Sequence, residues 1–480
     1  MVTMKKNSTS KKTNIKTASQ QRIQTIKETS EEHRRAFAQH FTPKETALLA
    51  VSMFSPTKES ICCLDLGAGT GMLSVALAER YGKQISQIDC IEADATLAPI
   101  CNQALGQVNH NVIIADALLD TPKKQYERII LNPPYKKMSP NDPRQKELPV
   151  PSPNLYSAFL SIAISRLSDN GEVVAIIPRS WTNGSYFSTF RKWALSQCSL
   201  DAMHIYDSRS EVFQDTDVLQ EIMIVRFSKR VQSPTVKVSS SSNQNGEINV
   251  AEYAYDTLVQ GDGKIVRIAP SEGKTSSTIE DSGYCPSTGK VVDFRATERI
   301  YNTHQEALNA ADKSSDIYPL VYAGNMKNSK LEHPATIGKP QWFRADDEKS
   351  VNQLIPAGSY VFVKRFTSKE ETKRVVAFPI AIDKPLALEN HMSFIHSGTP
   401  RKVIPLSDKV IAQGISIWLN SSYIDNWFRD MSGSTQVNAK DIKAMPCPDK
   451  EMLLKLGKRW TETMSQNQID KIVKELIKLG

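Results

Sequence analysis

The sequence predicts a doubly wound α/β domain followed by a second domain of mixed α+β structure. From about residue 33 to 230, short apolar runs typical of buried strands alternate with apolar residues at helical spacing. A glycine-rich turn follows the first of these runs, and a serine-rich stretch separates this half from a more irregular one. With 480 residues the chain is long enough for two or three domains.

The elements of the first domain are predicted in chain order. Residues 61–65 have the composition of a buried strand, and residues 72–80 are expected to form the helix after the glycine-rich turn. Apolar spacing predicts another helix over 155–167. The other strands are expected at 85–92, 111–115, 129–131, 173–177 and 218–227, with 203–206 able to pair with the last.

Changes in composition along the chain predict where its segments begin and end. The N-terminal segment is basic and poor in apolar residues, which predicts a disordered tail. The polar run over residues 239–246 predicts a linker. The irregular second half contains strand-like runs such as 359–364, and amphipathic spacing predicts a final helix. The expected segments are therefore 1–32, 33–232, 233–250, 251–450 and 451–480.

Composition also restricts the class of protein. With 40% hydrophobic and 23% charged residues, and no apolar run of about 18 residues, we expect a globular chain without a membrane span. The N-terminus lacks the apolar core of a secretory signal. The seven cysteines contain no Cys-x-x-Cys pair, which favours reduced thiols in a cytoplasmic protein over disulfides or metal ligands. The first 35 residues carry six of the eight net positive charges, so bulk charge does not identify a partner.

The glycine-rich turn at 65–71 reads Asp-Leu-Gly-Ala-Gly-Thr-Gly, which differs from the dinucleotide pattern G-x-G-x-x-G. Glycine lets the backbone approach a ligand closely, although such a turn can also be purely structural. Glu92 ends the next strand, where a carboxylate can accept both ribose hydroxyls of a nucleoside. Asp116 could accept from an adenine amino group, and Phe159 could cover the adenine or simply be core. The candidate cofactor residues are Asp65, Gly67, Gly69, Gly71, Glu92, Asp116 and Phe159.

A second motif, Asn132-Pro133-Pro134-Tyr135, follows the apolar run at 129–131. An exocyclic adenine amine is a poor nucleophile, because its lone pair is delocalised into the ring. The Asn132 side-chain carbonyl and the Pro133 backbone carbonyl can accept its two N–H bonds and localise that lone pair, while the prolines keep these carbonyls rigid. Tyr135 offers an aromatic face to a flipped base. Together the motifs predict methyl transfer from S-adenosylmethionine to an amino group, but they leave adenine in DNA, adenine in RNA and protein glutamine open.

The order of the motifs resembles the gamma class of N6-adenine DNA methyltransferases of type II restriction–modification systems. Phe41-Thr42-Pro43 is similar to the opening motif of that family, which implies contact with the methionine end of the cofactor. The resemblance also implies that Phe213, otherwise expected in the core, stacks on the flipped adenine beside Tyr135. It implies a Rossmann-like S-adenosylmethionine-dependent methyltransferase domain at 33–232 and a target-recognition domain at 251–450.

Two segments of the second half, 362–369 and 434–441, resemble target-recognition segments of such enzymes. The cations in the first could neutralise phosphates, and the amides in the second could contact phosphate or base edges. A solvated basic strand and a polar turn before a helix are the alternative interpretation. The candidate DNA-binding residues are Lys364, Arg365, Lys369, Gln436 and Asn438.

The leading hypothesis is an enzyme that holds double-stranded DNA between two domains and methylates one flipped adenine. It would protect host DNA from a cognate restriction endonuclease and act as a monomer or weak dimer. The alternatives are a methyltransferase of RNA adenine or protein glutamine, and a catalytically inactive DNA-binding protein. The long second half argues against the first alternative, and the intact Asp65, Glu92 and Asn132 argue against the second.

Overall fold

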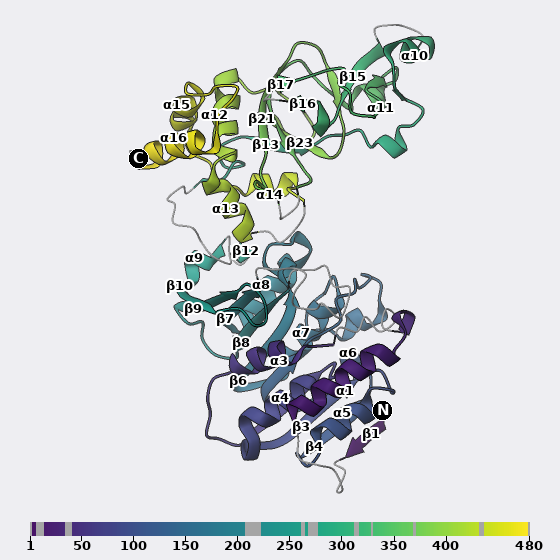
Figure 1. Ribbon diagram of the computed structural model, residues 1–480, viewed down its shortest axis with the longest axis vertical. Helices are drawn as coiled ribbons and strands as arrows, with labels where there is room; N and C mark the ends of the chain where they lie inside the picture. Colours follow the sequence, from purple (N-terminus) through teal and green to yellow (C-terminus); the bar gives the residue numbers. More distant parts are fainter. Residues whose placement is uncertain are drawn as a thin grey trace. The chain divides into compact units, whose positions relative to one another are not determined.

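The computed structural model describes residues 2–5, 14–33, 41–206, 222–260, 265–266, 277–311, 316–327, 330–367, 371–431 and 436–478. The chain divides into two compact units (Figure 1). Unit 1 comprises residues 1–270 together with 431–433, and unit 2 comprises the remainder.

Unit 1 is built on a ten-stranded sheet in the order β1-β4-β3-β2-β5-β6-β8-β7-β9-β10. The five strands from β4 to β6 are parallel, and β8 runs antiparallel between β6 and β7. The expected α/β fold is therefore confirmed, as is the pairing of 203–206 with the last expected strand, whose residues 218–221 lie outside the described residues. The strands are β1 Val2–Lys5, β2 Ile61–Leu66, β3 Ile85–Glu92, β4 His110–Ile114, β5 Tyr126–Leu131, β6 Leu167–Pro178, β7 Ser199–Tyr206, β8 Ile222–Ser228, β9 Thr235–Ser241 and β10 Asn249–Ala254.

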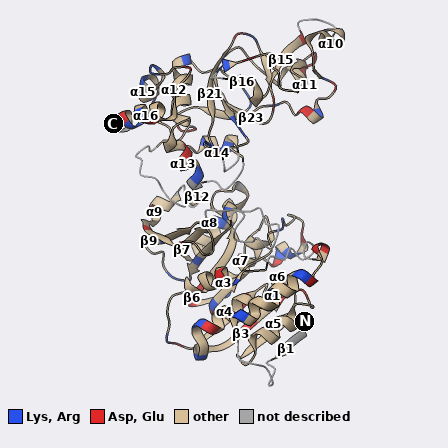
Figure 2. Ribbon diagram, viewed as in Figure 1, with Lys and Arg blue, Asp and Glu red and all other residues tan. Residues whose placement is uncertain are grey.

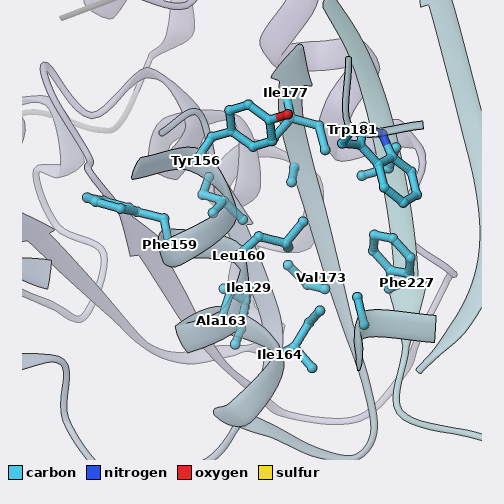
Figure 3. Close-up of a cluster of buried hydrophobic side chains, with 14 of the residues drawn as sticks. Ile129, Tyr156, Phe159, Leu160, Ala163, Ile164, Val173, Ile177, Trp181 and Phe227 are labelled. Atoms are coloured by element: carbon cyan, nitrogen blue, oxygen red, sulfur yellow. The ribbon is translucent and has the colours of Figure 1, made fainter. Parts of the chain in front are cut away.

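Helices cover both faces of this sheet. Because successive side chains of a strand point to opposite faces, β5 places Ile129 and Leu131 in one core and Ile130 in the other. Helices α7 and α8 pack on the first core, which includes Ile129, Tyr156 and Leu160 (Figure 3), and α1, α3, α4 and α5 pack on the second. The helices are α1 Ile15–Glu28, α3 Lys44–Ser52, α4 Met72–Tyr81, α5 Ala98–Leu105, α6 Ala117–Asp120, α7 Leu155–Ser165, α8 Ser188–Gln197 and α9 Tyr255–Leu258.

The expectation of a disordered tail over 1–32 is wrong for residues 2–5, which form β1 and pair with β4, and for residues 15–28, which form α1. Its buried face carries Ile15, Ala18, Arg22 and Thr25, spaced three or four residues apart. Asn14 caps the helix by accepting hydrogen bonds from two backbone N–H groups of its first turn. Only two of the four buried side chains are apolar, so hydrophobic periodicity was too weak to predict the helix.

The expected linker over 233–250 is also wrong, because β9 and the start of β10 extend the sheet there. Strand β9 pairs in parallel with β7. Two of its serines bind a histidine of β7: the Ser239 hydroxyl lies 2.9 Å from His204 Nδ1, and the Ser241 hydroxyl lies 3.2 Å from His204 Nε2. His204 is fully buried, so the serines supply the hydrogen bonds that its ring requires there. The unit boundary falls at residue 270, and not within 233–250.

The strand order of unit 1 determines where a ligand can bind. The chain proceeds outward in one direction from β2 through β3 to β4, then returns to the other side of β2 with β5 and β6. In open α/β sheets, ligands bind beyond the carboxyl ends of the strands where the order reverses in this way. Leu66, the last residue of β2, pairs with Leu131, the last residue of β5. The glycine-rich turn and the Asn-Pro-Pro-Tyr motif therefore leave the sheet side by side.

Unit 2 is mixed α+β, as expected. It contains a four-stranded sheet, β13-β23-β20-β21, and a five-stranded sheet, β14-β18-β15-β22-β19. Its strands are β13 Cys285–Thr288, β14 Ile300–Tyr301, β15 Ile317–Val321, β16 Met326–Lys327, β17 Lys330–Leu331, β18 Trp342–Arg344, β19 Leu354–Ile355, β20 Gly358–Lys364, β21 Ala377–Ile382, β22 Leu386–Leu388 and β23 Met392–His396. Its helices are α10 His304–Asn309, α11 Glu348–Val351, α12 Lys409–Leu419, α13 Ser422–Met431, α14 Ala439–Lys443, α15 Lys450–Gly457 and α16 Gln466–Lys478.

The single C-terminal helix expected over 451–480 is wrong, because two helices occupy this region. Helix α15 ends at Gly457 and α16 begins at Gln466. Both contact α12, against which they bury their apolar residues. An added Cβ on Gly457 would lie 1.9 Å from the Val410 carbonyl oxygen, so a glycine is required where α15 meets α12.

Charged side chains are distributed over both units. Figure 2 shows Lys and Arg interspersed with Asp and Glu along the ribbons. In the part of the chain that the structure describes, no helix has the length and apolarity needed to cross a membrane.

Candidate active site

A cavity of about 480 Å³ lies at the carboxyl ends of β2, β3, β4 and β5. Its wall brings together residues that the sequence places in separate motifs. Leu97, Leu155 and Phe159 add apolar surface, while Lys136, Lys137 and Arg144 add cations. The predicted site residues in the wall are Phe41, Thr42, Gly67, Gly69, Glu92, Asp116, Asn132, Pro134 and Phe159.

The glycine-rich turn has a backbone that side chains rarely tolerate. The φ angles of Gly67, Gly69 and Gly71 are +77°, +56° and +83°. A Cβ on Gly71 would also lie 3.0 Å from the Cys101 sulfur, whereas a Cβ on Gly69 would meet nothing within 4 Å. Two hydrogen bonds to the Ile91 carbonyl, from the N–H groups of Gly67 and Ala68, fasten the turn to β3. The turn is therefore rigid and exposes backbone to the cavity.

The Glu92 carboxylate accepts hydrogen bonds from the backbone of this turn and of the loop after β3. Its Oε2 accepts from the Gly69 N–H at 2.7 Å, and its Oε1 accepts from the Asp94 N–H at 2.8 Å. Burial raises the pKa of the Glu92 carboxyl, while these backbone hydrogen bonds oppose the rise. Each carboxylate oxygen can accept a second hydrogen bond, so the group can still bind ligand hydroxyls. Asp94 is 2.7 Å from His33 Nε2, which ties the N-terminal segment to the same loop.

Asp65 lies beneath the turn and not in the cavity wall. It is fully buried, and its Oδ2 accepts a hydrogen bond from the Ser74 hydroxyl of α4 at 2.6 Å, while its Oδ1 has no hydrogen-bond partner. Burial raises the pKa of its carboxyl to about 7. Its position holds α4 against the end of β2. Pro43 and Gly71 also lie outside the wall, as the N-cap residues of α3 and α4.

Asp116 and Phe159 both line the cavity. Asp116 forms an ion pair there with Arg144, which the sequence did not predict. Asp116 caps α6, its Oδ1 accepting from the Leu118 N–H at 2.9 Å. Its Oδ2 lies 3.2 Å from Nη1 of Arg144, which belongs to the 3-10 helix Pro143–Glu147. The only sequence signal for this ion pair was a cation in the polar loop after the Asn-Pro-Pro-Tyr motif, and nothing in its spacing identified Asp116 as the partner.

The Asn132 amide is hydrogen-bonded at both of its ends. Its Nδ2 donates to Thr42 Oγ1 at 2.9 Å, and its Oδ1 accepts from the Tyr135 hydroxyl at 2.8 Å. The Tyr135 ring contacts Tyr156 edge-to-face, with centroids 6.3 Å apart. Pro133 is buried and Pro134 lies in the cavity wall. Phe213, the other expected stacking residue, lies outside the described residues.

Three of the candidate DNA-binding residues come together in unit 2. The Arg365 guanidinium lies 3.1 Å from Asn438 Oδ1, 3.5 Å from Gln436 Oε1 and 2.7 Å from the Asn390 carbonyl oxygen. Asn438 also caps α14. Lys364 is partly exposed at the end of β20, and Lys369 lies outside the described residues. We refer to Arg365, Gln436 and Asn438 as the Arg365 cluster.

The cavity suits a nucleoside that carries a polar chain. Carboxylates at the ends of β3 and β4 can accept from hydroxyl and amino groups, and Phe159 supplies an apolar surface for a ring. The glycine-rich turn leaves room for close approach of a ligand. The Asn132 amide lies in the same wall, so a group to be modified there would meet the bound ligand directly.

Several known proteins are similar to this chain in sequence or in fold. Residues 57–213 match the family model described as Eco57I restriction-modification methylase. The chain is 33% identical to the type II methyltransferase M.BsuBI of Bacillus subtilis, over 92% of this chain and 93% of that protein. It is 32% identical to the type II methyltransferase M.PstI of Providencia stuartii, over 87% of this chain and 88% of that protein. The structure of the type IIL restriction–modification enzyme MmeI in complex with DNA is similar in fold, with a TM-score of 0.57 and 14% identity over 88% of this chain and 70% of that one.

Proposed function

We propose that this chain, which belongs to the type II methyltransferases of restriction–modification systems, transfers a methyl group from S-adenosylmethionine to the N6 amino group of an adenine in duplex DNA. The observation that carries the proposal is the pairing of Leu66 with Leu131. It brings the glycine-rich turn and the Asn-Pro-Pro-Tyr motif to one cavity. A cofactor held by the first can therefore reach an amine held by the second.

The residues at and near the cavity support the following proposed cofactor contacts. Glu92 would accept the ribose hydroxyls, Asp116 the adenine amino group, and Phe159 would cover the adenine ring. Phe41, Thr42 and Pro43 would lie toward the methionine end, as the family resemblance implies. S-adenosylmethionine supplies an electrophilic methyl group when bound, and the protein residues hold and orient it.

Asn132 and Pro133 would act on the target base. Their two carbonyl oxygens accept the N–H bonds of the amine, which directs the nitrogen lone pair toward the methyl group and stabilises the positive charge that develops on the nitrogen. Tyr135 and Phe213 would stack on the flipped adenine. Placing the amine and the methyl donor in line supplies much of the remaining acceleration.

Unit 2 favours DNA over the other substrates. The similarity to the type II methyltransferases extends over about nine tenths of the chain, so it includes unit 2. Methylation of RNA adenine or of a protein glutamine would leave this unit without a role. We further propose that unit 2 recognises the target sequence, that a cognate restriction endonuclease exists, and that the enzyme acts as a monomer or weak dimer.

Isotope transfer tests the proposal. The protein is incubated with methyl-labelled S-adenosylmethionine and, separately, with duplex DNA, total RNA or protein extract. Digestion to nucleosides and mass spectrometry should show N6-methyladenine in DNA. Label only in RNA or protein, or N4-methylcytosine as the DNA product, would refute it.

A further inference from the structure

The orientation of the Asn132 amide decides whether its oxygen or its nitrogen meets the target amine. An asparagine amide carries an acceptor at one end and two donors at the other. A half turn of the group would present N–H bonds where the reaction requires an oxygen. Nδ2 donates to Thr42 Oγ1 at 2.9 Å and Oδ1 accepts from the Tyr135 hydroxyl at 2.8 Å, so the two hydroxyls hold the amide at both ends.

Thr42 is in turn held by the N-terminal helix. Arg22 of α1 donates from Nε to the carbonyl oxygen of Phe41, the residue before Thr42, at 3.1 Å. Arg22 is 3% exposed and Phe41 is 5% exposed. A guanidinium so deeply buried is retained only where hydrogen bonds compensate its loss of water. Helix α1 is itself fastened to α4, because the Ile15 N–H donates to the Glu79 carboxylate at 2.7 Å.

We infer that Thr42 and Arg22 are positioning residues for Asn132: Thr42 holds its amide in place by a hydrogen bond, and Arg22 holds the backbone that presents Thr42. The inference deepens the proposed function and rests on it, because Asn132 is the residue that receives the amine. It makes α1 a support of the reaction site. It also gives Thr42 a role in the chemical step beyond the cofactor contact that the family resemblance implies.

A pair of substitutions at Thr42 tests the first link. Thr42→Val keeps the shape and removes the hydroxyl, whereas Thr42→Ser keeps the hydroxyl. Single-turnover methyl transfer at saturating cofactor and DNA should slow by about tenfold in Thr42→Val, the effect of one lost hydrogen bond at the reacting group. Thr42→Ser should restore the rate at saturating cofactor, whatever change Thr42→Val makes to the dissociation constant for S-adenosylmethionine.

The opposite pattern would overturn the inference. If Thr42→Val raises the dissociation constant for S-adenosylmethionine but leaves the rate of the saturated complex unchanged, Thr42 is a cofactor residue only. Failure of Thr42→Ser to recover the rate would show that the side-chain volume matters, and not the hydroxyl.

A double-mutant cycle tests the second link. Arg22→Met removes the donors but keeps much of the side-chain length, and Lys27→Met on the exposed face of α1 is the matched control. Arg22→Met should slow single turnover, and the Arg22→Met/Thr42→Val double variant should be no slower than Thr42→Val alone, because both changes act through the same amide. Additive losses would overturn the link. Hydrogen exchange of residues 15–28 tells whether α1 is still docked; a detached helix with an unchanged rate would also overturn it.

The outcomes for Thr42 and for the proposed function can be separated. If the wild-type protein labels RNA or a protein and not DNA, the proposed function fails. The ratios between Thr42→Val, Thr42→Ser and wild type are then measured on whichever substrate is labelled. A rate defect restored by serine would still show that the Thr42 hydroxyl positions Asn132.

Discussion

Unit 1 gathers its polar candidate residues in the wall of one cavity, whereas three of those in unit 2 are hydrogen-bonded to one another. In unit 1 the strand order brings Glu92 and Asn132 to one cavity, where each is hydrogen-bonded to neighbouring protein groups. In unit 2 the guanidinium of Arg365 bonds to Asn438 and to a backbone carbonyl. A pocket for a small ligand requires groups that converge on one cavity, whereas contacts to the phosphates of a polymer are made by separate surface cations. Substitutions in the cavity wall of unit 1 should therefore change chemistry or cofactor binding, and removal of a solvent-accessible cation in unit 2 should change DNA affinity.

The largest effect is expected at Asn132. Asn132→Ala removes an acceptor of the target amine, so the single-turnover rate should fall by about 100-fold or more. Cofactor affinity and the salt dependence of DNA binding should stay near wild type, because neither depends mainly on this amide. Asn141→Ala, in an exposed position of the same unit, is the control. Unaffected methylation would show that the motif has another role.

Replacement of Glu92 should act on cofactor binding. Glu92→Gln removes one acceptor from a buried pair of hydrogen bonds, so the dissociation constant for S-adenosylmethionine should rise by about ten- to a hundredfold, the effect of a lost hydrogen bond to a charged group. Isothermal titration calorimetry measures it, with the exposed Glu59→Gln as control. DNA affinity in the absence of cofactor should be unchanged. If Glu92→Gln also lowered DNA affinity, cofactor binding and DNA binding would not be separate functions of the two units.

Asp65 should make the stability of unit 1 depend on pH. Burial raises the pKa of Asp65 from 3.8 to about 7, so between these values the folded state holds a proton that the unfolded state has lost. The free energy of unfolding should therefore fall as pH rises across this window, by up to about 1.4 kcal/mol per pH unit. Asp65→Asn should remove this slope. Urea unfolding of both proteins from pH 5 to 8 measures it; parallel curves would contradict the buried-acid explanation.

The contrast between the units also explains what the sequence could predict. Asp65, Glu92 and Asn132 were identified because each stands at or near the end of a recognisable strand, and the ends of parallel strands meet at one edge of the sheet. Helix α1 was missed because half of its buried positions are polar. Strand β9 was missed because the partner of its serines, His204, lies on a different strand.

The Arg365 cluster illustrates a second limit. The sequence nominated Arg365 and Asn438 as DNA contacts, but their hydrogen bonds to each other depend on tertiary structure. The pairing of Arg144 with Asp116 was missed for the same reason. Motifs indicate which side chains carry chemistry, whereas the partners that hold those side chains come from distant segments and must be read from the fold.

The smallest effect is expected at the end of β20, where Lys364 and its neighbour should behave differently. If Lys364 neutralises one phosphate, Lys364→Ala should reduce the slope of log affinity against log salt concentration by about 0.9, with only a modest loss of affinity at moderate salt. Lys364→Arg keeps the charge and should preserve the slope.

Arg365→Met should instead lower the stability of unit 2 by about 1–3 kcal/mol, because it leaves Asn438 and the Asn390 carbonyl without this donor. Filter binding across a salt series, together with thermal unfolding, separates the two effects. An Arg365→Met variant with full stability and a reduced slope would assign Arg365 to the phosphates, and the Arg365 cluster would then be a binding surface that the hydrogen bonds only arrange.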